Sequence, residues 1–173
     1  MMRYSNCMSS LIVIAHNVRS AHNIGSLLRT CEGLGVDKVI ISGYTPFPPL
    51  AHNDPRLPHE QVKVAKLIQK TALGAENTQE WDRQEDITVT FAQLKQQGYT
   101  IAALEQTNGS ISLPDFKSPS KLAIVLGREV EGLEPEILNA CDLALEIPMF
   151  GQKESYNVVQ AAAMALYHCR FIA

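Results

Sequence analysis

The sequence lacks the features of membrane and secreted proteins. None of its apolar runs reaches the roughly 18 residues needed to span a bilayer, so we expect no contact with the membrane. The N-terminal stretch MMRYSNCMSSLIVIAHN has one arginine and a short apolar core, which is more typical of a first strand than of a signal peptide. We therefore expect a cytoplasmic protein.

The sequence also has few cysteines and little net charge. Its four cysteines are far apart, without a CxxC or Cys/His spacing, so we expect reduced, mostly buried thiols and no metal. They are Cys7, Cys31, Cys141 and Cys169. The formal charge of −3 gives no general attraction for nucleic acid, and any nucleic-acid site must be local.

Several common catalytic and nucleotide-binding motifs are absent. No GxGxxG follows the first apolar run, and no GxxxxGK[ST] occurs, so dinucleotide and P-loop sites have no specific support. The sequence also lacks the GxSxG of serine hydrolases.

Short apolar runs alternate with helical patterns. We expect strands at residues 11–17, 36–42, 99–104, 122–126 and 144–147, each of strand length. We expect helices that begin with Asn23 as cap, span residues 87–97, begin near Pro135 and follow Asn157. At 173 residues this alternation predicts one α/β domain with a mainly parallel sheet flanked by helices.

Two segments stand out in this pattern. From Val158 to Leu166 only Gln160 is polar, so we expect this helix to be covered by its own domain or by a second copy of the chain. The stretch from residue 56 to 70 is the most basic, with four cations against Glu60. These residues alone favour a solvated helix face slightly over a nucleic-acid patch.

Polar turns follow four of the expected strands. They come after Asn17, Leu104, Leu126 and Ile147. Ligands of open parallel sheets bind beyond the carboxyl ends of the strands, so these four turns are candidates for one shared site.

Three segments resemble the motifs of the SpoU (TrmH) branch of the SPOUT RNA methyltransferases. They are N-x-x-x-x-x-N-I-G-x-x-x-R-T at residues 17–30, LGREVEGL at residues 126–133 and I-P-M-x-G-x-x-x-S-Y-N-V at residues 147–158. KTALGAE at residues 70–76 is similar to a further segment of that branch. The match covers nearly the whole chain, in the expected order and spacing.

The resemblance implies a single SPOUT methyltransferase domain over residues 1–173, with a C-terminal trefoil knot. It implies that the knot binds S-adenosylmethionine (AdoMet), that the protein is a homodimer, and that it methylates the ribose 2′-oxygen of structured RNA without a metal. We expect tRNA as substrate, because the chain resembles the small members without an N-terminal RNA-binding extension. The alternatives are rRNA methylation, a non-catalytic knotted module that binds RNA or senses the cofactor, and a generic nucleotide-binding α/β enzyme.

The same motifs imply roles for individual residues. Arg29 is the expected catalytic residue, and because guanidinium is always charged, we expect it to bind phosphate and stabilise a forming alkoxide rather than act as a base. Asn23 orients that arginine or the ribose, or merely caps its helix. Glu129 is the acidic residue of the second motif, or a structural acceptor for loop amides. Ser155 and Asn157 are expected near cofactor and RNA, or as helix caps.

The expected binding residues fall into two groups. The cofactor group is Leu104, Glu105, Gly127, Ile147, Met149, Ser155 and Tyr156. The RNA group is Arg19, Arg56, Lys63, Lys66, Lys70 and Arg128. Tyr156 replaces the usual leucine of the family and Arg128 a frequent asparagine, so we expect a reshaped pocket wall at the first position and a contact with RNA or solvent at the second.

Overall fold

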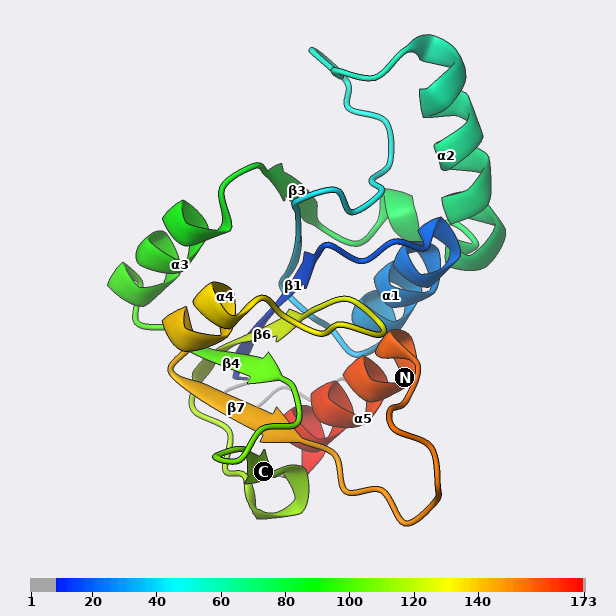
Figure 1. Cartoon of the computed structure of the whole chain (residues 1–173). Coiled ribbons are helices and arrows are strands. Elements are labelled where there is room, and N and C mark those ends of the chain that lie inside the picture. Colours follow the sequence, from blue (N-terminus) through cyan, green and yellow to red (C-terminus); the bar gives the residue numbers. More distant parts are fainter. Residues whose placement is uncertain (1–8, 173) are drawn as a thin grey trace, which may run out of the picture.

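The structure, a computed structural model, describes residues 9–172, which form a seven-stranded sheet between two layers of helices (Figure 1). The strands are β1 (Ser10–His16), β2 (Lys38–Ser42), β3 (Trp81–Gln84), β4 (Thr100–Leu104), β5 (Ile111–Ser112), β6 (Lys121–Leu126) and β7 (Leu143–Glu146). The helices are α1 (Ala21–Gly33), α2 (Pro58–Ala72), α3 (Ile87–Gln96), α4 (Pro135–Ala140) and α5 (Val158–Phe171), with short 3-10 turns at Ala75–Asn77 and Leu113–Asp115.

The strands lie in the order β3-β2-β1-β6-β4-β7-β5, and their pairings are all parallel over residues 9–172. The predicted α/β fold with a parallel sheet is therefore confirmed. Because parallel strands point the same way, the segments that leave β1, β4, β6 and β7 all emerge at one edge of the sheet.

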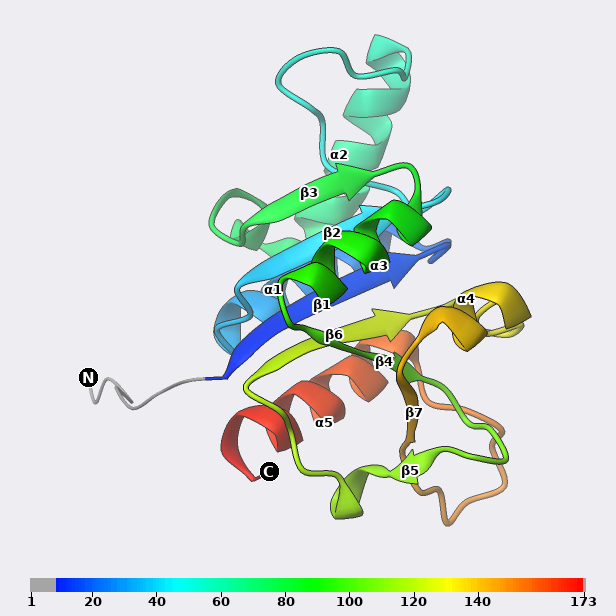
Figure 2. The same cartoon turned by 90° about the vertical axis from the view of Figure 1, so that its left-hand side faces the viewer.

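Alternating side chains of the buried strands form two cores. In β1, Leu11 and Val13 pack toward α1 and α5, while Ile12 and Ile14 pack toward α3 and α4. Figure 2, drawn from the side of α3, shows α3 in front of the sheet and α1 and α5 behind it.

The start of α1 differs from the prediction. Ser20, not Asn23, is the N-cap, and its hydroxyl accepts the main-chain N–H of Asn23 at 3.2 Å. Serine and asparagine are both good N-caps, so the residue type of Asn23 was not sufficient to place the start of the helix. The expected first position of Pro135 in α4, whose N-cap is Glu134, and the expected N-cap Asn157 before α5 are confirmed.

Helix α2 and the proline-rich segment before it, residues 43–57, project past the sheet (Figures 1 and 2). Arg56 holds this projection together. Its guanidinium pairs with Asp54 at 2.6 Å, donates to the carbonyl oxygen of Phe47 at 2.8 Å and lies 3.7 Å from the centre of the Phe47 ring. The guanidinium of Arg83 lies 4.4 Å from the same ring. This projection is therefore an ordered part of the fold.

The expected strands are present, with ends within two residues of the prediction. The prediction missed β3 and β5. The cysteines within the described residues are free thiols, two buried and one half-buried, while Cys7 lies outside these residues. None of the helices in residues 9–172 is long and apolar enough to cross a membrane.

Helix α1 crosses α2 at Gly25. A Cβ atom there would overlap the carbonyl oxygen of Ile68 and the hydroxyl of Thr71. We therefore expect Gly25→Ala to lower the free energy of unfolding by about 1 to 3 kcal/mol, the usual cost of overpacking. Gly33→Ala, at the open end of the same helix, has no neighbour within 4 Å and should be neutral or stabilising by up to about 1 kcal/mol. Urea denaturation of both variants tests this, and equal stabilities would contradict it.

Candidate functional site

A cavity of about 540 Å³ lies beyond the carboxyl ends of β4, β6 and β7. Leu104, Leu126 and Ile147, which end or follow these strands, all line it. The seven residues expected to bind a cofactor are all among the lining residues: Leu104, Glu105, Gly127, Ile147, Met149, Ser155 and Tyr156. The turn after Asn17, the fourth expected contributor, does not line the cavity.

The loop between β6 and α4, residues 127–134, forms one wall of this cavity. Its main chain folds back on itself through two hydrogen bonds between Arg128 and Gly132, of 3.3 and 3.2 Å. Gly127 permits this fold, because a Cβ atom there would lie 2.8 Å from the main chain of Gly132 and Leu133. The fold of the loop therefore explains the glycine at this position without a bound ligand. Glu105, after β4, supports the loop by accepting the N–H of Leu133 at 3.2 Å.

Side chains of the segment 16–23 hold the 127–134 loop from behind. The Asn23 amide donates to Glu129 at 2.9 Å. Arg19 donates to Glu131 at 3.0 Å, and the Asn17 amide donates to Glu134 at 2.9 Å. The first and second motifs are therefore joined by three side-chain contacts. Asn17 belongs to the first motif, but no role for Glu131 or Glu134 was expected from the sequence.

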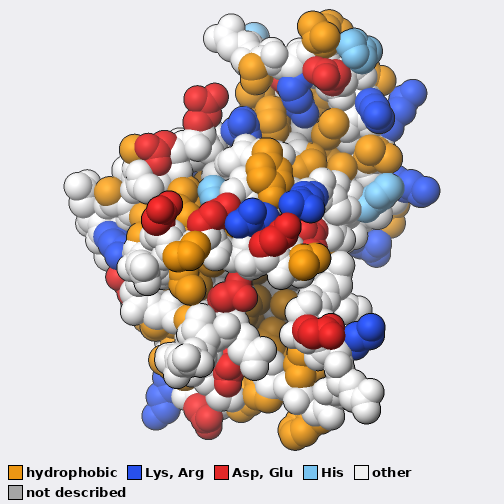
Figure 3. Space-filling model, in the orientation of Figure 1, with side chains coloured by type: hydrophobic (Ala, Val, Ile, Leu, Met, Phe, Trp, Pro, Cys, Tyr) orange, Lys and Arg blue, Asp and Glu red, His pale blue; other side chains and the backbone are white. Residues whose placement is uncertain are grey.

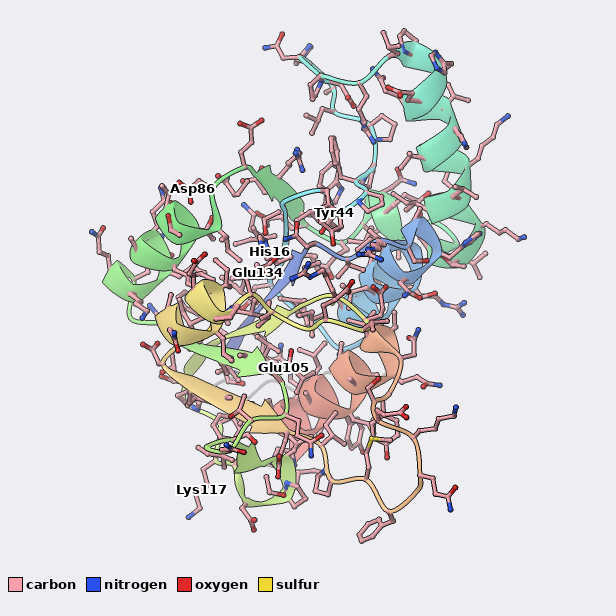
Figure 4. All side chains as sticks on the ribbon, in the orientation of Figure 1. His16, Tyr44, Asp86, Glu105, Lys117 and Glu134 are labelled. Carbon is pink, nitrogen blue, oxygen red and sulfur yellow. The ribbon has the colours of Figure 1, made fainter. Side chains whose placement is uncertain are left out.

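Glu134 is the centre of a polar cluster behind the cavity. Its carboxylate pairs with Arg128 at 3.2 Å. Its second oxygen is buried, has no hydrogen bond to residues 9–172 and lies 3.5 Å from Nε2 of His16. Figure 4 shows His16 and Glu134 next to each other, between Tyr44 and Glu105. Burial raises the pKa of Glu134, but hydrogen bonds from its own N–H and from Asn17, with the neighbouring His16 and Arg128, lower it overall.

His16 contacts Ser42 as well as Glu134, with 2.8 Å between Nδ1 and the Ser42 hydroxyl. A serine, a histidine and a carboxylate thus follow one another as in a hydrolase triad. Ser42, however, has an exposed fraction of 0% and His16 one of only 7%, so a substrate cannot reach the hydroxyl. The cluster is structural.

Asn157 joins the third motif to the other two. Its side-chain oxygen caps α5 by accepting the N–H of Val159 at 2.9 Å, and its amide nitrogen donates to the Asn23 oxygen at 3.4 Å. Asn157, Asn23 and Glu129 therefore form a hydrogen-bonded chain at the edge of the cavity. Glu129 accepts a hydrogen bond from the side-chain amide of Asn23. The alternative expectation for Glu129 was a structural acceptor for main-chain amides of its loop.

Arg29 does not line this cavity. It is exposed on α1 and has no hydrogen bond or ion pair within the described part of the chain. It lines a shallow second hollow between α1, the end of α2 and α5, together with Ser26, Thr30, Gly33, Leu34, Thr71, Ala163 and Tyr167.

The six residues expected to bind RNA lie in three different settings. Arg19 and Arg128 pair with glutamates of the 127–134 loop. Arg56 is engaged inside the projection, with only 16% of its side chain exposed. Lys63, Lys66 and Lys70 are exposed on one face of α2, at helical spacing and without ion pairs among residues 9–172.

A model of the SpoU rRNA Methylase family matches residues 10–167, which include all three segments that meet at the cavity and its edge. The chain belongs to this family. The resemblance of its motifs is thereby confirmed, and the motifs make the contacts described above.

Individual family proteins match most of this chain. A protein of Staphylococcus haemolyticus (strain JCSC1435) named "Putative TrmH family tRNA/rRNA methyltransferase" is 31% identical over 158 residues, which are 91% of this chain and 57% of the relative. The chain thus spans little more than half the length of that relative.

Two solved structures have the same fold. The AdoMet-bound rRNA methyltransferase of Sinorhizobium meliloti has a TM-score of 0.75 at 20% identity, over 96% of this chain and 60% of that one. An RNA 2′-O ribose methyltransferase also has a TM-score of 0.75, at 22% identity, over 98% of this chain and 58% of that one.

The buried His16 makes stability depend on pH. Burial lowers its pKa from the ordinary 6.5; Glu134 opposes this shift and Arg128 adds to it. As pH falls, His16 is therefore protonated in the unfolded chain before it is protonated in the folded one. The free energy of unfolding then decreases below about pH 6.5. The total loss is about 1.4 kcal/mol for each unit by which the pKa of the folded state lies below that of the unfolded state. Denaturation between pH 7.5 and 5.5 should show this loss.

The matched variants are His16→Gln, which removes the titrating ring, and His59→Gln, which changes an exposed histidine of α2. The pH dependence should be weaker in the first variant and unchanged in the second. A wild-type slope that survives His16→Gln would contradict the assignment. The lowered pKa of Glu134 affects stability in a separate pH range. Its contribution is lost as pH falls below the ordinary carboxyl pKa of 4.5.

Proposed function

We propose that this chain is an AdoMet-dependent methyltransferase that acts on a ribose 2′-oxygen of structured RNA, with tRNA the favoured substrate. The observation that carries the proposal is the meeting of three family motifs around one cavity, whose edge bears the chain Asn157, Asn23 and Glu129. The printed names of the relatives support RNA methylation. They leave both tRNA and rRNA open, and rRNA is the second candidate.

The cavity suits AdoMet in size and chemistry. Its volume of about 540 Å³ lies within the ordinary range of small-molecule sites. Leu104, Leu126 and Ile147 offer an apolar wall for an adenine ring, and the loops offer main-chain groups and carboxylates for the polar parts. Bound AdoMet supplies an activated methyl group. The protein then has to align the 2′-oxygen with it and stabilise charge. We also propose the trefoil knot that the family resemblance implies.

Arg29 is proposed to act across a homodimer. In its own subunit it lies outside the cavity, in the hollow beside Ala163 and Tyr167 of α5. Tyr167 is 52% exposed, and the first turns of α5 are only half-buried, which supports a second copy covering this face. Arg29 of the partner subunit then holds the phosphate beside the target ribose.

Lysines of α2 are proposed to hold the body of the RNA. Lys63, Lys66 and Lys70 point away from the buried face of α2, which carries Ile68 and Ala72. Blue side chains gather at the upper right of Figure 3, where α2 lies in Figure 1. Arg56 belongs to this site only indirectly, because its contacts with Asp54 and Phe47 keep the projection rigid.

The proposed role of Arg29 is tested by methyl transfer from labelled AdoMet to total tRNA, rRNA fragments and DNA of matched sequence. Arg29→Ala should reduce transfer by about 100-fold or more, because it removes an electrostatic donor. Arg29→Lys should restore little, since an ammonium lacks the bidentate fork. AdoMet binding should persist in both variants.

The control is Lys117→Ala, which removes a cation that Figure 4 shows far from α1. Mixed dimers of Arg29→Ala with the cavity variant Gly127→Val should regain activity if Arg29 acts across the interface. Near wild-type turnover in Arg29→Ala would reject its catalytic role. Label in DNA would exclude the 2′-oxygen as acceptor, and label in rRNA alone would reject the tRNA assignment.

The lysines of α2 are tested by Lys63→Gln, Lys66→Gln and Lys70→Gln, combined in one variant. RNA binding should weaken and KM should rise, while kcat stays close to wild type, because the contacts are remote from the reacting atoms. The dependence of log affinity on log salt should fall by about 0.7 to 0.9 per lost phosphate contact. Lys117→Gln is the matched control, and an unchanged salt dependence in the triple variant would contradict the assignment.

A further inference from the structure

The cavity is lined by an excess of negative charge. Four carboxylates line it, against Arg128 as the one cation among the lining residues. The carboxylates are Glu105, Glu129, Glu146 and Glu154. Figure 3 shows red side chains around the hollow below the centre of this face, whereas the blue ones gather mainly elsewhere.

This charge is not neutralised by the described part of the protein. Glu129 accepts an amide of Asn23, Glu105 accepts the N–H of Leu133, and Glu146 accepts the hydroxyl of Ser110 at 2.7 Å. These donors are all neutral. Glu154 is exposed and has neither a hydrogen bond nor an ion pair within residues 9–172.

Arg128 does not offset the four carboxylates. Its guanidinium pairs at 3.2 Å with Glu134, the last residue of the 127–134 loop, which lies outside the cavity lining. Its charge is therefore already matched by a carboxylate that does not line the cavity. Because field lines concentrate in a cleft with walls of low dielectric, the cavity should favour a ligand with net positive charge.

Methyl transfer changes the charge of the ligand that the proposed function assigns to this cavity. AdoMet carries a sulfonium, an ammonium and a carboxylate, so its net charge is +1 at neutral pH. In the transfer, a lone pair of the 2′-oxygen forms the new C–O bond and the electrons of the S–CH₃ bond return to sulfur. The hydroxyl proton leaves to solvent. The product S-adenosylhomocysteine (AdoHcy) has a neutral thioether and no net charge.

We propose that the uncompensated carboxylates make this cavity selective for the sulfonium form, so that AdoMet binds more tightly than AdoHcy and the product is released once its positive charge is gone. The inference rests on the proposed function. It adds that Glu146 and Glu154 are specificity-determining residues, which act through their charge rather than through a hydrogen bond to adenosine. The same field disfavours RNA phosphates in the cavity, which is consistent with phosphate binding by lysines elsewhere.

The test measures binding by calorimetry and involves no turnover. The ligands are AdoMet, AdoHcy and sinefungin, an analogue with a positively charged amine near the position of the sulfonium. Wild-type protein should bind AdoMet and sinefungin about tenfold more tightly than AdoHcy, and the ratio should shrink as salt is added. Glu146→Gln with Glu154→Gln should reduce the ratio by about threefold to tenfold, as expected for two charges several ångström away.

The matched control is Glu85→Gln, which removes one exposed carboxylate before α3, outside the cavity lining. Its AdoMet to AdoHcy ratio should equal that of wild type. Equal wild-type affinities for AdoMet and AdoHcy, or an unchanged ratio in the double variant, would overturn the inference and leave the proposed function standing. Folded protein that binds none of the three ligands would overturn both.

Discussion

The wall of the cavity depends on hydrogen bonds between two segments far apart in the chain. The 127–134 loop has two main-chain hydrogen bonds of its own, and the side chains of Asn17, Arg19 and Asn23 hold its carboxylates. A partly buried carboxylate such as Glu134 is costly unless its partners are in place. The shape of the loop therefore depends on β1 and β6 lying side by side.

The strand order explains why one edge of the sheet holds the cavity. Strand β6 lies between β1 and β4, and β7 follows β4, so the second motif is next to the first on one side and faces the third on the other. Helix α5 then closes the site, because its N-cap Asn157 also contacts Asn23. Asn157 therefore both caps α5 and shapes the edge of the cavity.

Charge is unevenly distributed over the molecule, although its net value is small. Carboxylates surround the cavity, while exposed lysines lie on the projecting face of α2. Under the proposed function, the two regions serve ligands of opposite charge, a sulfonium and a phosphate chain. The Arg56 contacts with Asp54 and Phe47 order the segment that leads into the helix with these lysines.

The sequence by itself determined the alternation of strands and helices, the ends of most elements and the three motif segments, because these depend on local apolar spacing and turn residues. It did not reveal β3, whose residues WDRQ are half-buried at the edge of the sheet, or β5, which has only two residues. Tertiary structure alone decided that Glu134 meets Asn17, 117 positions away, that Arg56 turns inward and that Arg29 lies outside the cavity. These contacts follow from strand order and helix crossing, and a local pattern of residues carries no information about which strands become neighbours.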